Sequence, residues 1–205
     1  MPQIAYVPHV KRALDLVFAT LALAACLPAL GLAALAVRFD SAGPALFAQE
    51  RVGQYGRRFK LWKLRTMVSG ASAFGPSVTA RGDPRVTRVG RVLRSTKLDE
   101  LPQLWNVLRG EMSVVGPRPE VAEFVELFQG DYDIILSMPP GVTDEASVLF
   151  RREEDLLAEA DDPHARYVRE ILPRKIALAR DYVARPSFRR DVAIVARTLS
   201  KVVLS

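Results

Sequence analysis

The hydrophobic pattern of the chain is dominated by one long apolar segment near its start. Residues 13–37, ALDLVFATLALAACLPALGLAALAV, contain a single charged residue, Asp15. As a straight helix this segment would be ~37 Å long, enough to cross ~30 Å of hydrocarbon. Pro28 lies inside it, where it removes a backbone hydrogen bond and clashes with the preceding turn. Because neither arm beside Pro28 is long enough to span alone, the pattern predicts a re-entrant helical hairpin within residues 1–38.

Two other interpretations of the apolar segment stay open. A membrane-spanning helix tolerates a proline kink. A secretory signal would use Lys11 and Arg12 before the apolar run and residues 34–36 as its cleavage site, although the run is longer than a usual signal core. The flanking charges favour the hairpin, because Lys/Arg-rich flanks prefer the cytoplasmic side and a hairpin keeps both flanks there. The basic residues that follow the segment are Arg38, Arg51, Arg57, Arg58 and Lys60.

Residues 39–205 are expected to form a mainly α-helical catalytic domain with minor β structure. The stretch GPALFAQERVGQYGRRFKLW, residues 43–62, predicts short strands joined by a turn. Residues 69–84 are small, polar and punctuated by Gly and Pro, which predicts a mobile surface loop. Further helices are expected over residues 120–128 and over residues 151–185, with interruptions near Pro163 and Pro173.

A last helix is expected after Pro186, with Ser187 as its cap. Its apolar and basic residues fall on different sides: Val192, Val195, Leu199 and Val202 on one, and Arg190, Arg197 and Lys201 on another. A basic amphipathic helix of this kind rests on anionic lipid headgroups. Alternatively, its apolar side packs on the protein core, and both interpretations stay open.

The charge balance predicts an anionic partner. The 205 residues carry a net charge of +6, with an isoelectric point near 9.8. Nucleic acid, a phospholipid surface and a phosphorylated substrate all fit this excess. The single cysteine, Cys26, excludes a disulfide framework. The two histidines, His9 and His164, are far apart, so neither a zinc site nor a His-based triad is indicated, and catalysis must rest on carboxylates, Lys/Arg and a hard cation such as Mg²⁺.

The most informative stretch is RVTRVGRVLRSTKLDELPQLWNVL, residues 85–108. Its second half predicts a helix whose buried stripe consists of Leu101, Leu104, Trp105 and Leu108. Pro102 is tolerated only in the first turn of a helix, so Asp99 and Glu100 lie at or just before the N-terminus. Thr96 and Asp99 also fit a capping pattern.

Two interpretations of the Asp99–Glu100 pair compete. Acidic residues at a helix start often only complement the helix dipole. Three neighbours favour a phosphoryl-transfer centre: cations at every third position before the pair, Arg118 between two prolines in GPRPEV, and the free N–H groups of a helix start. In such a centre a carboxylate coordinates Mg²⁺ or attacks phosphorus, and we expect Asp99 to be ionised at neutral pH.

Several motifs resemble one known family. KRALDLVFA, the proline-containing apolar segment, DPRVTRVGRVLRSTKLDELPQLWNVLRGEMSVVGPRPE and PPGVTDEASVLFR follow one another along the chain. This order resembles the bacterial sugar transferase family, the monotopic phosphoglycosyltransferases, over essentially the whole length. Leu27 stands where many members carry Ser, Pro139 where an Arg is frequent, and Asp144 where some branches have Gly.

The resemblance implies transfer of a phosphosugar from a UDP-sugar to polyprenol phosphate, giving polyprenyl-diphosphosugar and UMP in a ping-pong reaction. Asp99 is implied as the nucleophile, and Glu100 as the residue that helps to hold Mg²⁺ or manages a proton. Arg94, Arg118 and Lys63 are implied contacts to substrate phosphate. The resemblance further implies the cytoplasmic face of the bacterial inner membrane, phospholipid contacts and no nucleic acid, and it leaves the oligomeric state open, with an oligomer possible.

Two rival functions make predictions that differ from those of the transferase. A membrane-tethered basic binding protein without catalysis would tolerate Asp99→Asn. A metal-dependent phosphodiesterase would release sugar phosphate steadily in the absence of a lipid acceptor. The sequence leaves the identity of the sugar open.

Overall fold

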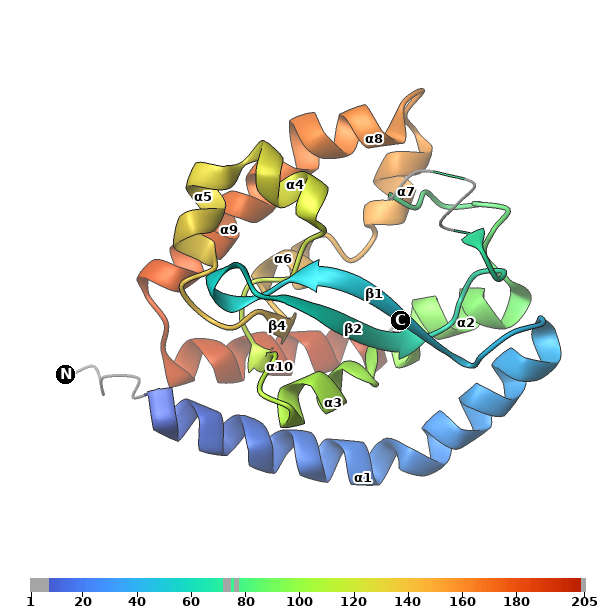
Figure 1. Ribbon diagram of the computed structural model, residues 1–205, viewed down its shortest axis with the longest axis horizontal. Coiled ribbons are helices and arrows are strands. Elements are labelled where there is room, and N and C mark those ends of the chain that lie inside the picture. Colours follow the sequence, from blue (N-terminus) through green and yellow to red (C-terminus); the bar gives the residue numbers. More distant parts are fainter. Residues whose placement is uncertain (1–7, 72–74, 76–77, 204–205) are drawn as a thin grey trace.

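The computed structural model describes residues 8–71, 75 and 78–203, and the molecule is mainly helical with two small sheets (Figure 1). The first half contains α1 (Pro8–Asp40), β1 (Leu46–Val52), β2 (Arg58–Leu64), α2 (Arg88–Thr96), the 3₁₀ turn η3 (Leu98–Glu100), α3 (Gln103–Leu108) and β3 (Ser113–Val115). The second half contains α4 (Ala122–Leu127), α5 (Gln129–Ile135), β4 (Gly141–Thr143), α6 (Glu145–Leu149), α7 (Glu153–Ala158), α8 (Pro163–Arg166), the π-helical turn η4 (Tyr167–Ile171), α9 (Leu172–Ala184) and α10 (Phe188–Val203).

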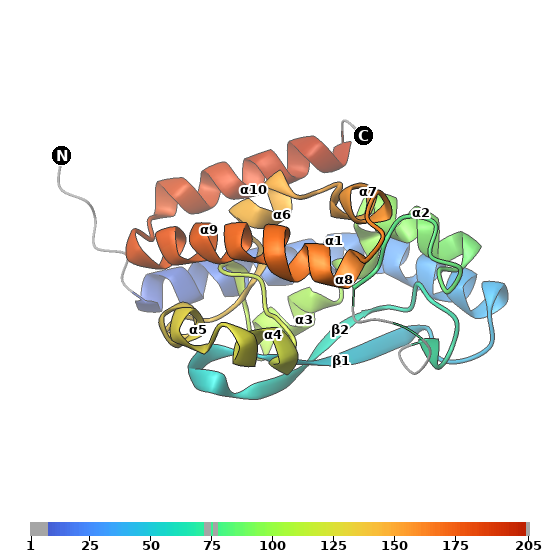
Figure 2. The same cartoon turned by 90° about the horizontal axis from the view of Figure 1, so that it is seen from above.

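The predicted strands form an antiparallel hairpin of β1 and β2, which confirms the sequence pattern. Seen from above, this hairpin and α10 lie on opposite sides of the molecule, with α3 and α9 between them (Figure 2). Phe59 and Leu61 of β2 point into the core and pack near α3. Because alternate residues of a strand share a face, Lys63 lies on this inner face too.

The second sheet brings two distant loops together. β3 and β4 pair in parallel, with Ser113 opposite Gly141 and Val115 opposite Thr143. The backbones then approach closely at Gly116 and Gly141, where a Cβ on Gly141 would lie 2.1 Å from the Gly116 nitrogen. Only glycine allows this approach. The loop after β3, which contains Arg118, is therefore held against the start of α6.

Pro28 lies inside α1 and does not end it. The helix is continuous from Pro8 to Asp40 and curves toward its C-terminal end (Figure 1). The prediction of two separate arms on either side of Pro28 was therefore wrong. A proline removes one backbone hydrogen bond and kinks a helix, and both halves of α1 are supported by packing. The second half packs through Leu30 and Val37 on Leu64 and Leu93.

The N-terminal end of α1 is fixed to the domain by buried polar groups. Lys11 Nζ lies 2.6 Å from Asp191 Oδ2 of α10. Arg12 donates to the carbonyl oxygen of Val107 at 2.6 Å, at the end of α3. Asp15 accepts from the Ser113 hydroxyl at 2.7 Å. Three elements of the domain thus hold the first two turns of the helix.

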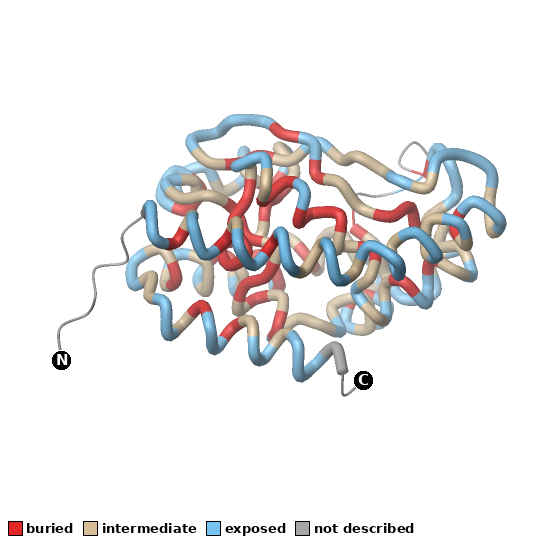
Figure 3. Tube along the Cα trace, turned by 90° about the horizontal axis from the view of Figure 1, so that it is seen from below, coloured by how far each residue is buried: buried red, intermediate tan, exposed pale blue. Residues whose placement is uncertain are grey.

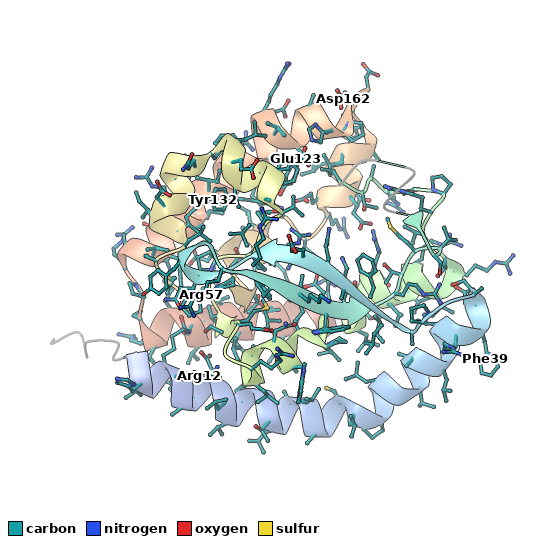
Figure 4. The ribbon with its side chains drawn as sticks, viewed as in Figure 1. Arg12, Phe39, Arg57, Glu123, Tyr132 and Asp162 are labelled. Carbon is teal, nitrogen blue, oxygen red and sulfur yellow. The ribbon has the colours of Figure 1, made fainter. Side chains whose placement is uncertain are left out.

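The C-terminal end of α1 is fixed in the same way. Arg65, which is 5% exposed, donates to the carbonyl oxygens of Val37 and Ser41 at 3.5 and 2.9 Å. Asp40 accepts from the backbone N–H of Val89 at 3.0 Å. Arg12 and Phe39 mark the two ends of α1 in Figure 4. Both ends are therefore bound to the same domain.

The outer face of α1 is apolar and exposed. The helix is long and apolar enough to cross a membrane, and almost none of its most apolar window is buried. Its turns and those of α10 run along one face of the molecule (Figure 3). The exposed large apolar residues of α1 are Val10, Leu14, Val17, Phe18, Leu21, Leu27, Leu32, Leu35 and Phe39.

The predicted apolar side of the C-terminal helix is only partly packed on the core. Ser187 accepts from the backbone N–H of Arg190 at 3.3 Å, which confirms it as the cap of α10. Val195 packs against the core, whereas Val192 and Leu199 are at least half exposed. The predicted stripe is therefore divided between the core and the outer face, and the side chain of Val202 lies outside the described residues.

The other predicted helices are shorter than expected. The segment 120–128 contains α4, and α5 follows it directly. The predicted interruption near Pro163 is confirmed, because α7 ends at Ala158 and α8 begins at Pro163. The predicted interruption near Pro173 was wrong, because η4 leads directly into α9 and Pro173 lies in the first turn of α9. Part of the loop predicted over residues 69–84 lies outside the described residues.

Arg65→Lys should destabilise the protein by at least about 3 kcal/mol. An ammonium group cannot reach the carbonyl groups that the guanidinium joins, and each hydrogen bond of a charged group contributes about 1.5–3 kcal/mol. Arg58→Lys is the matched control, because Arg58 and its partner Glu50 are about 60% exposed, and it should change stability by less than about 0.5 kcal/mol. Urea unfolding in detergent measures the stability of both variants. Equal losses of stability would contradict the role of Arg65 in fixing the end of α1.

Candidate active site

The carboxylate pair lies in a short turn between two helices. Asp99 and Glu100 belong to η3, and α3 begins three residues later, after Pro102. This confirms the prediction that the pair directly precedes a helix. Lys97, which ends α2, adopts a left-handed conformation with φ 59° and reverses the chain before the pair.

Three details of this segment differ from the sequence predictions. The Thr96 hydroxyl donates to the Val92 carbonyl oxygen at 2.9 Å, so it does not cap α3. No side chain caps the N-terminus of the 6-residue α3, so Asp99 does not act as its cap either. Trp105 is 51% exposed and not part of the buried stripe, because the buried side of α3 consists of Gln103, Leu104, Asn106 and Val107.

Glu100 is bound on both oxygens by Arg118. The guanidinium Nη2 lies 2.6 Å from Oε1 and Nη1 lies 3.1 Å from Oε2. Burial alone would raise the pKa of Glu100, but the charge and hydrogen bonds of Arg118 lower it to about 2. Glu100 is therefore ionised at neutral pH.

Arg51 and Glu120 stabilise the loop that carries Arg118. Arg51 Nη1 donates to the Pro119 carbonyl oxygen and to Glu120 Oε2, each at 3.1 Å. Tyr167 donates to the other oxygen of Glu120 at 2.9 Å. Neither Arg51 nor Glu120 was predicted from the sequence as a site residue. The strand pattern predicts only that Arg51 shares a face with Phe47, and the contact with Glu120 depends on the tertiary fold.

Asp99 is a buried carboxylate with one oxygen that is unpartnered among the described residues. It is 7% exposed, and its Oδ1 has no hydrogen-bond partner among the described residues. Burial and the adjacent Glu100 raise the pKa of Asp99 to about 6, against the opposing effect of Lys97, Lys63 and Arg94. The carboxylate is thus still mostly ionised at pH 7, as expected, but more basic than an exposed aspartate.

Lys63 contributes a positive charge next to the carboxylate pair. Its ammonium lies 5.5 Å from the centre of the Phe47 ring. Among the described residues, this ammonium has no hydrogen-bond acceptor and no ion-pair partner. Burial and the neighbouring Arg51 lower the pKa of Lys63 to about 8, so it is still mostly charged at pH 7. This ammonium is therefore available to an incoming anion.

Arg94 lies at the end of α2 and is engaged by other side chains. Its Nε donates to the Thr66 hydroxyl at 2.9 Å and its Nη1 lies 2.7 Å from Glu154 of α7. Its charge also acts on Asp99. The structure therefore brings all five predicted residues (Asp99, Glu100, Arg94, Arg118 and Lys63) to one site, with Arg94 and Arg118 already paired.

Mg²⁺ has one well-suited ligand at this site. The described residues contain no group of three His, Cys, Asp or Glu side chains able to hold a metal together. Mg²⁺ is often bound by one or two carboxylates together with substrate phosphates and water. Asp99 fits this arrangement through its unpartnered Oδ1. Glu100 fits less well, because both its oxygens already accept from Arg118.

Substitutions around Asp99 should shift its pKa in opposite directions. Lys63→Met should raise the pKa above about 6, because it removes a cation that favours the ionised carboxylate. Glu100→Gln should lower it, because it removes a like charge. Lys60→Met is the control, since Lys60 is exposed on the outer face of β2. Carbon-13 NMR titration of the aspartate carboxyl groups measures the shifts, and a lower pKa in Lys63→Met would contradict this geometry.

Comparison with known proteins places the chain in a family. The family described as bacterial sugar transferase matches residues 6–205. The UDP-glucose:undecaprenyl-phosphate glucose-1-phosphate transferase of Caulobacter vibrioides is 42% identical over 192 residues, covering 92% of this chain and 68% of the relative. The protein of the same name from Escherichia coli (strain K12) is 38% identical over 196 residues, covering 93% of this chain and 39% of the relative.

A third relative is named for a different sugar. The UDP-N-acetylgalactosamine-undecaprenyl-phosphate N-acetylgalactosaminephosphotransferase of Aeromonas hydrophila is 33% identical over 196 residues, covering 94% of this chain and 43% of the relative. The chain thus spans less than half the length of the E. coli and Aeromonas proteins. The matches nevertheless cover more than 90% of its own length, and the family match over residues 6–205 includes the carboxylate pair and the Arg118 loop. The chain is an enzyme of the bacterial sugar transferase family.

Proposed function

We propose that this enzyme transfers a sugar 1-phosphate from a UDP-sugar to polyprenol phosphate, giving polyprenyl-diphosphosugar and UMP. The observation that carries the proposal is the buried Asp99 carboxylate, whose Oδ1 is unpartnered among the described residues. Beside it lie the Glu100–Arg118 ion pair and the ammonium of Lys63. A basic, unpaired carboxylate among cations suits attack on an anionic phosphorus centre. The names of the relatives support the same substrate classes.

The first step is attack by Asp99 on the phosphorus that bears the sugar. A bond forms between a carboxylate oxygen of Asp99 and this phosphorus, and the phosphorus–oxygen bond to the UMP portion breaks. UMP leaves with the bridging oxygen and its electron pair. Lys63 and Arg94 neutralise the charge that accumulates on the phosphate oxygens. The product on the enzyme is a phosphosugar-aspartyl intermediate.

The second step regenerates the enzyme. A phosphate oxygen of polyprenol phosphate attacks the phosphorus of the intermediate, and the bond to Asp99 breaks. The Asp99 carboxylate recovers its electron pair, so no water and no additional proton donor are needed. Mg²⁺, when bound through Asp99 and the substrate phosphates, would supply further charge neutralisation. Glu100 remains ionised and holds Arg118 throughout.

The arrangement of α1 supports insertion into one side of the bacterial inner membrane. Both ends of α1 are bound to the catalytic domain, through Asp191 at one end and Arg65 at the other. Its outer face is apolar. A helix held in this way enters and leaves on the cytoplasmic side, with the catalytic domain at the headgroup level. The lipid phosphate and the water-soluble UDP-sugar then meet at one site.

Asp99→Asn should lower UMP release by at least about 10³-fold, because an amide cannot act as the nucleophile. Wild-type protein is assayed with Mg²⁺, polyprenol phosphate and a panel of UDP-glucose, UDP-galactose and UDP-N-acetylgalactosamine. Asp133→Asn, an exposed position on α5, should retain wild-type activity. No UMP with any donor, or an unimpaired Asp99→Asn variant, would refute the proposed function.

Cysteine labelling should place both ends of α1 on the cytoplasmic side. In a Cys26→Ala background, single cysteines replace His9 and Arg38, both exposed. An impermeant thiol reagent should label neither in intact spheroplasts and both after permeabilisation. Asp162→Cys serves as the reference, because Asp162 is exposed on the catalytic domain. Labelling of only one end from outside would show that α1 crosses the membrane.

A further inference from the structure

The Pro117-Arg118-Pro119 segment contains a single backbone donor. Proline has no N–H group, so only Arg118 can donate from its main chain. This N–H lies 3.2 Å from Asp144 Oδ2. The carbonyl groups on either side are also bound, Pro117 by the Gly141 N–H at 2.9 Å and Pro119 by Arg51 at 3.1 Å. The contact with Asp144 is therefore the one that fixes the backbone N–H of Arg118.

Asp144 uses its two oxygens for different purposes. It lies between β4 and α6, and its Oδ1 accepts from the backbone N–H of Ser147 at 2.7 Å, which caps α6. Its Oδ2 accepts from Arg118. The side chain is 6% exposed. A buried carboxylate in this position ties the start of α6 to the loop that carries the guanidinium.

The loop lies in a closely packed region. Pro117, Pro119 and Glu120 are buried, and the cavity beside them is only about 20 Å³, lined in part by Arg118, Glu120, Tyr132, Asp144 and Lys175. A backbone N–H without an acceptor would be costly in such a place, so its hydrogen bond constrains where the backbone lies. The guanidinium of Arg118 must meet both oxygens of Glu100 at the same time, which requires accurate placement of its backbone.

We propose that Asp144 is a positioning residue: it holds the Arg118 backbone so that the guanidinium binds Glu100 and leaves Asp99 free to react. The inference rests on the proposed phosphosugar transfer. It assigns Asp144 no contact with substrate. Its effect on the reaction passes entirely through Arg118.

Asp144→Asn separates the two roles of this side chain. Asparagine keeps an oxygen for the Ser147 N–H, and it is a good helix cap. In place of Oδ2 it presents an amide donor to the Arg118 N–H, which removes the hydrogen bond. We expect kcat for UMP release to fall about 10- to 100-fold, with KM for the UDP-sugar within about twofold, because misplaced groups near the reaction centre lose transition-state interactions. Asp144→Ser should give the same result, since serine caps helices but is too short to reach Arg118.

Asp162→Asn is the matched control. Asp162 caps α8 with the same geometry, accepting from the Ala165 N–H at 2.9 Å. It lies at the top of the molecule, opposite α1 (Figure 4). Its substitution should leave both kcat and KM unchanged. Melting temperatures of both asparagine variants should agree within a few degrees, which tests that α6 remains capped.

A double substitution tests whether Asp144 acts through Arg118. In an Arg118→Lys background, adding Asp144→Asn should change the single-turnover rate of UMP release by less than about twofold. Wild-type rates in both Asp144→Asn and Asp144→Ser, or an equal loss in the wild-type and Arg118→Lys backgrounds, would overturn the inference. Absence of UMP release from the wild-type enzyme would instead refute the proposed function.

Discussion

The ion pair between Glu100 and Arg118 is the interaction on which the site depends. The pair is partly buried, with the Arg118 side chain 34% and the Glu100 side chain 17% exposed, and it contributes more to a defined geometry than to stability. Here it joins the η3 turn to the loop after β3. It also separates the pKa values of two adjacent carboxyl groups, with Glu100 near 2 and Asp99 near 6. Such a separation assigns different chemical roles to neighbouring carboxylates.

Polar contacts also connect α1 to the domain. Buried polar contacts at Lys11 and Asp15 fix one end of the helix, and Arg65 fixes the other. The long apolar helix is thus part of the folded domain and not an appended anchor, and α3, which packs on α1, directly follows the carboxylate pair. This arrangement keeps the site close to the apolar face that α1 and α10 present, which suits an enzyme that uses one lipid substrate and one soluble substrate.

Local signals in the sequence predicted the parts of the structure that depend on neighbouring residues. Turn residues around Gly53 predicted the hairpin, and Pro102 placed the carboxylate pair before a helix. Pro28 was misjudged because its outcome depends on Leu64 and Leu93, which support the helix from outside its own segment. Asp144 was identified only as a departure from the family pattern. Its contact with Arg118 arises from the pairing of β3 with β4, which no local pattern specifies.

The most direct test of the mechanism is the fate of Asp99 when no acceptor is present. The enzyme is incubated with a UDP-sugar and Mg²⁺ but without polyprenol phosphate, quenched in acid, and examined by intact-protein and peptide mass spectrometry. We predict one equivalent of UMP and a phosphosugar adduct that maps to Asp99. Continuous release of free sugar phosphate from unmodified protein, or an adduct on another residue, would contradict a covalent mechanism through Asp99.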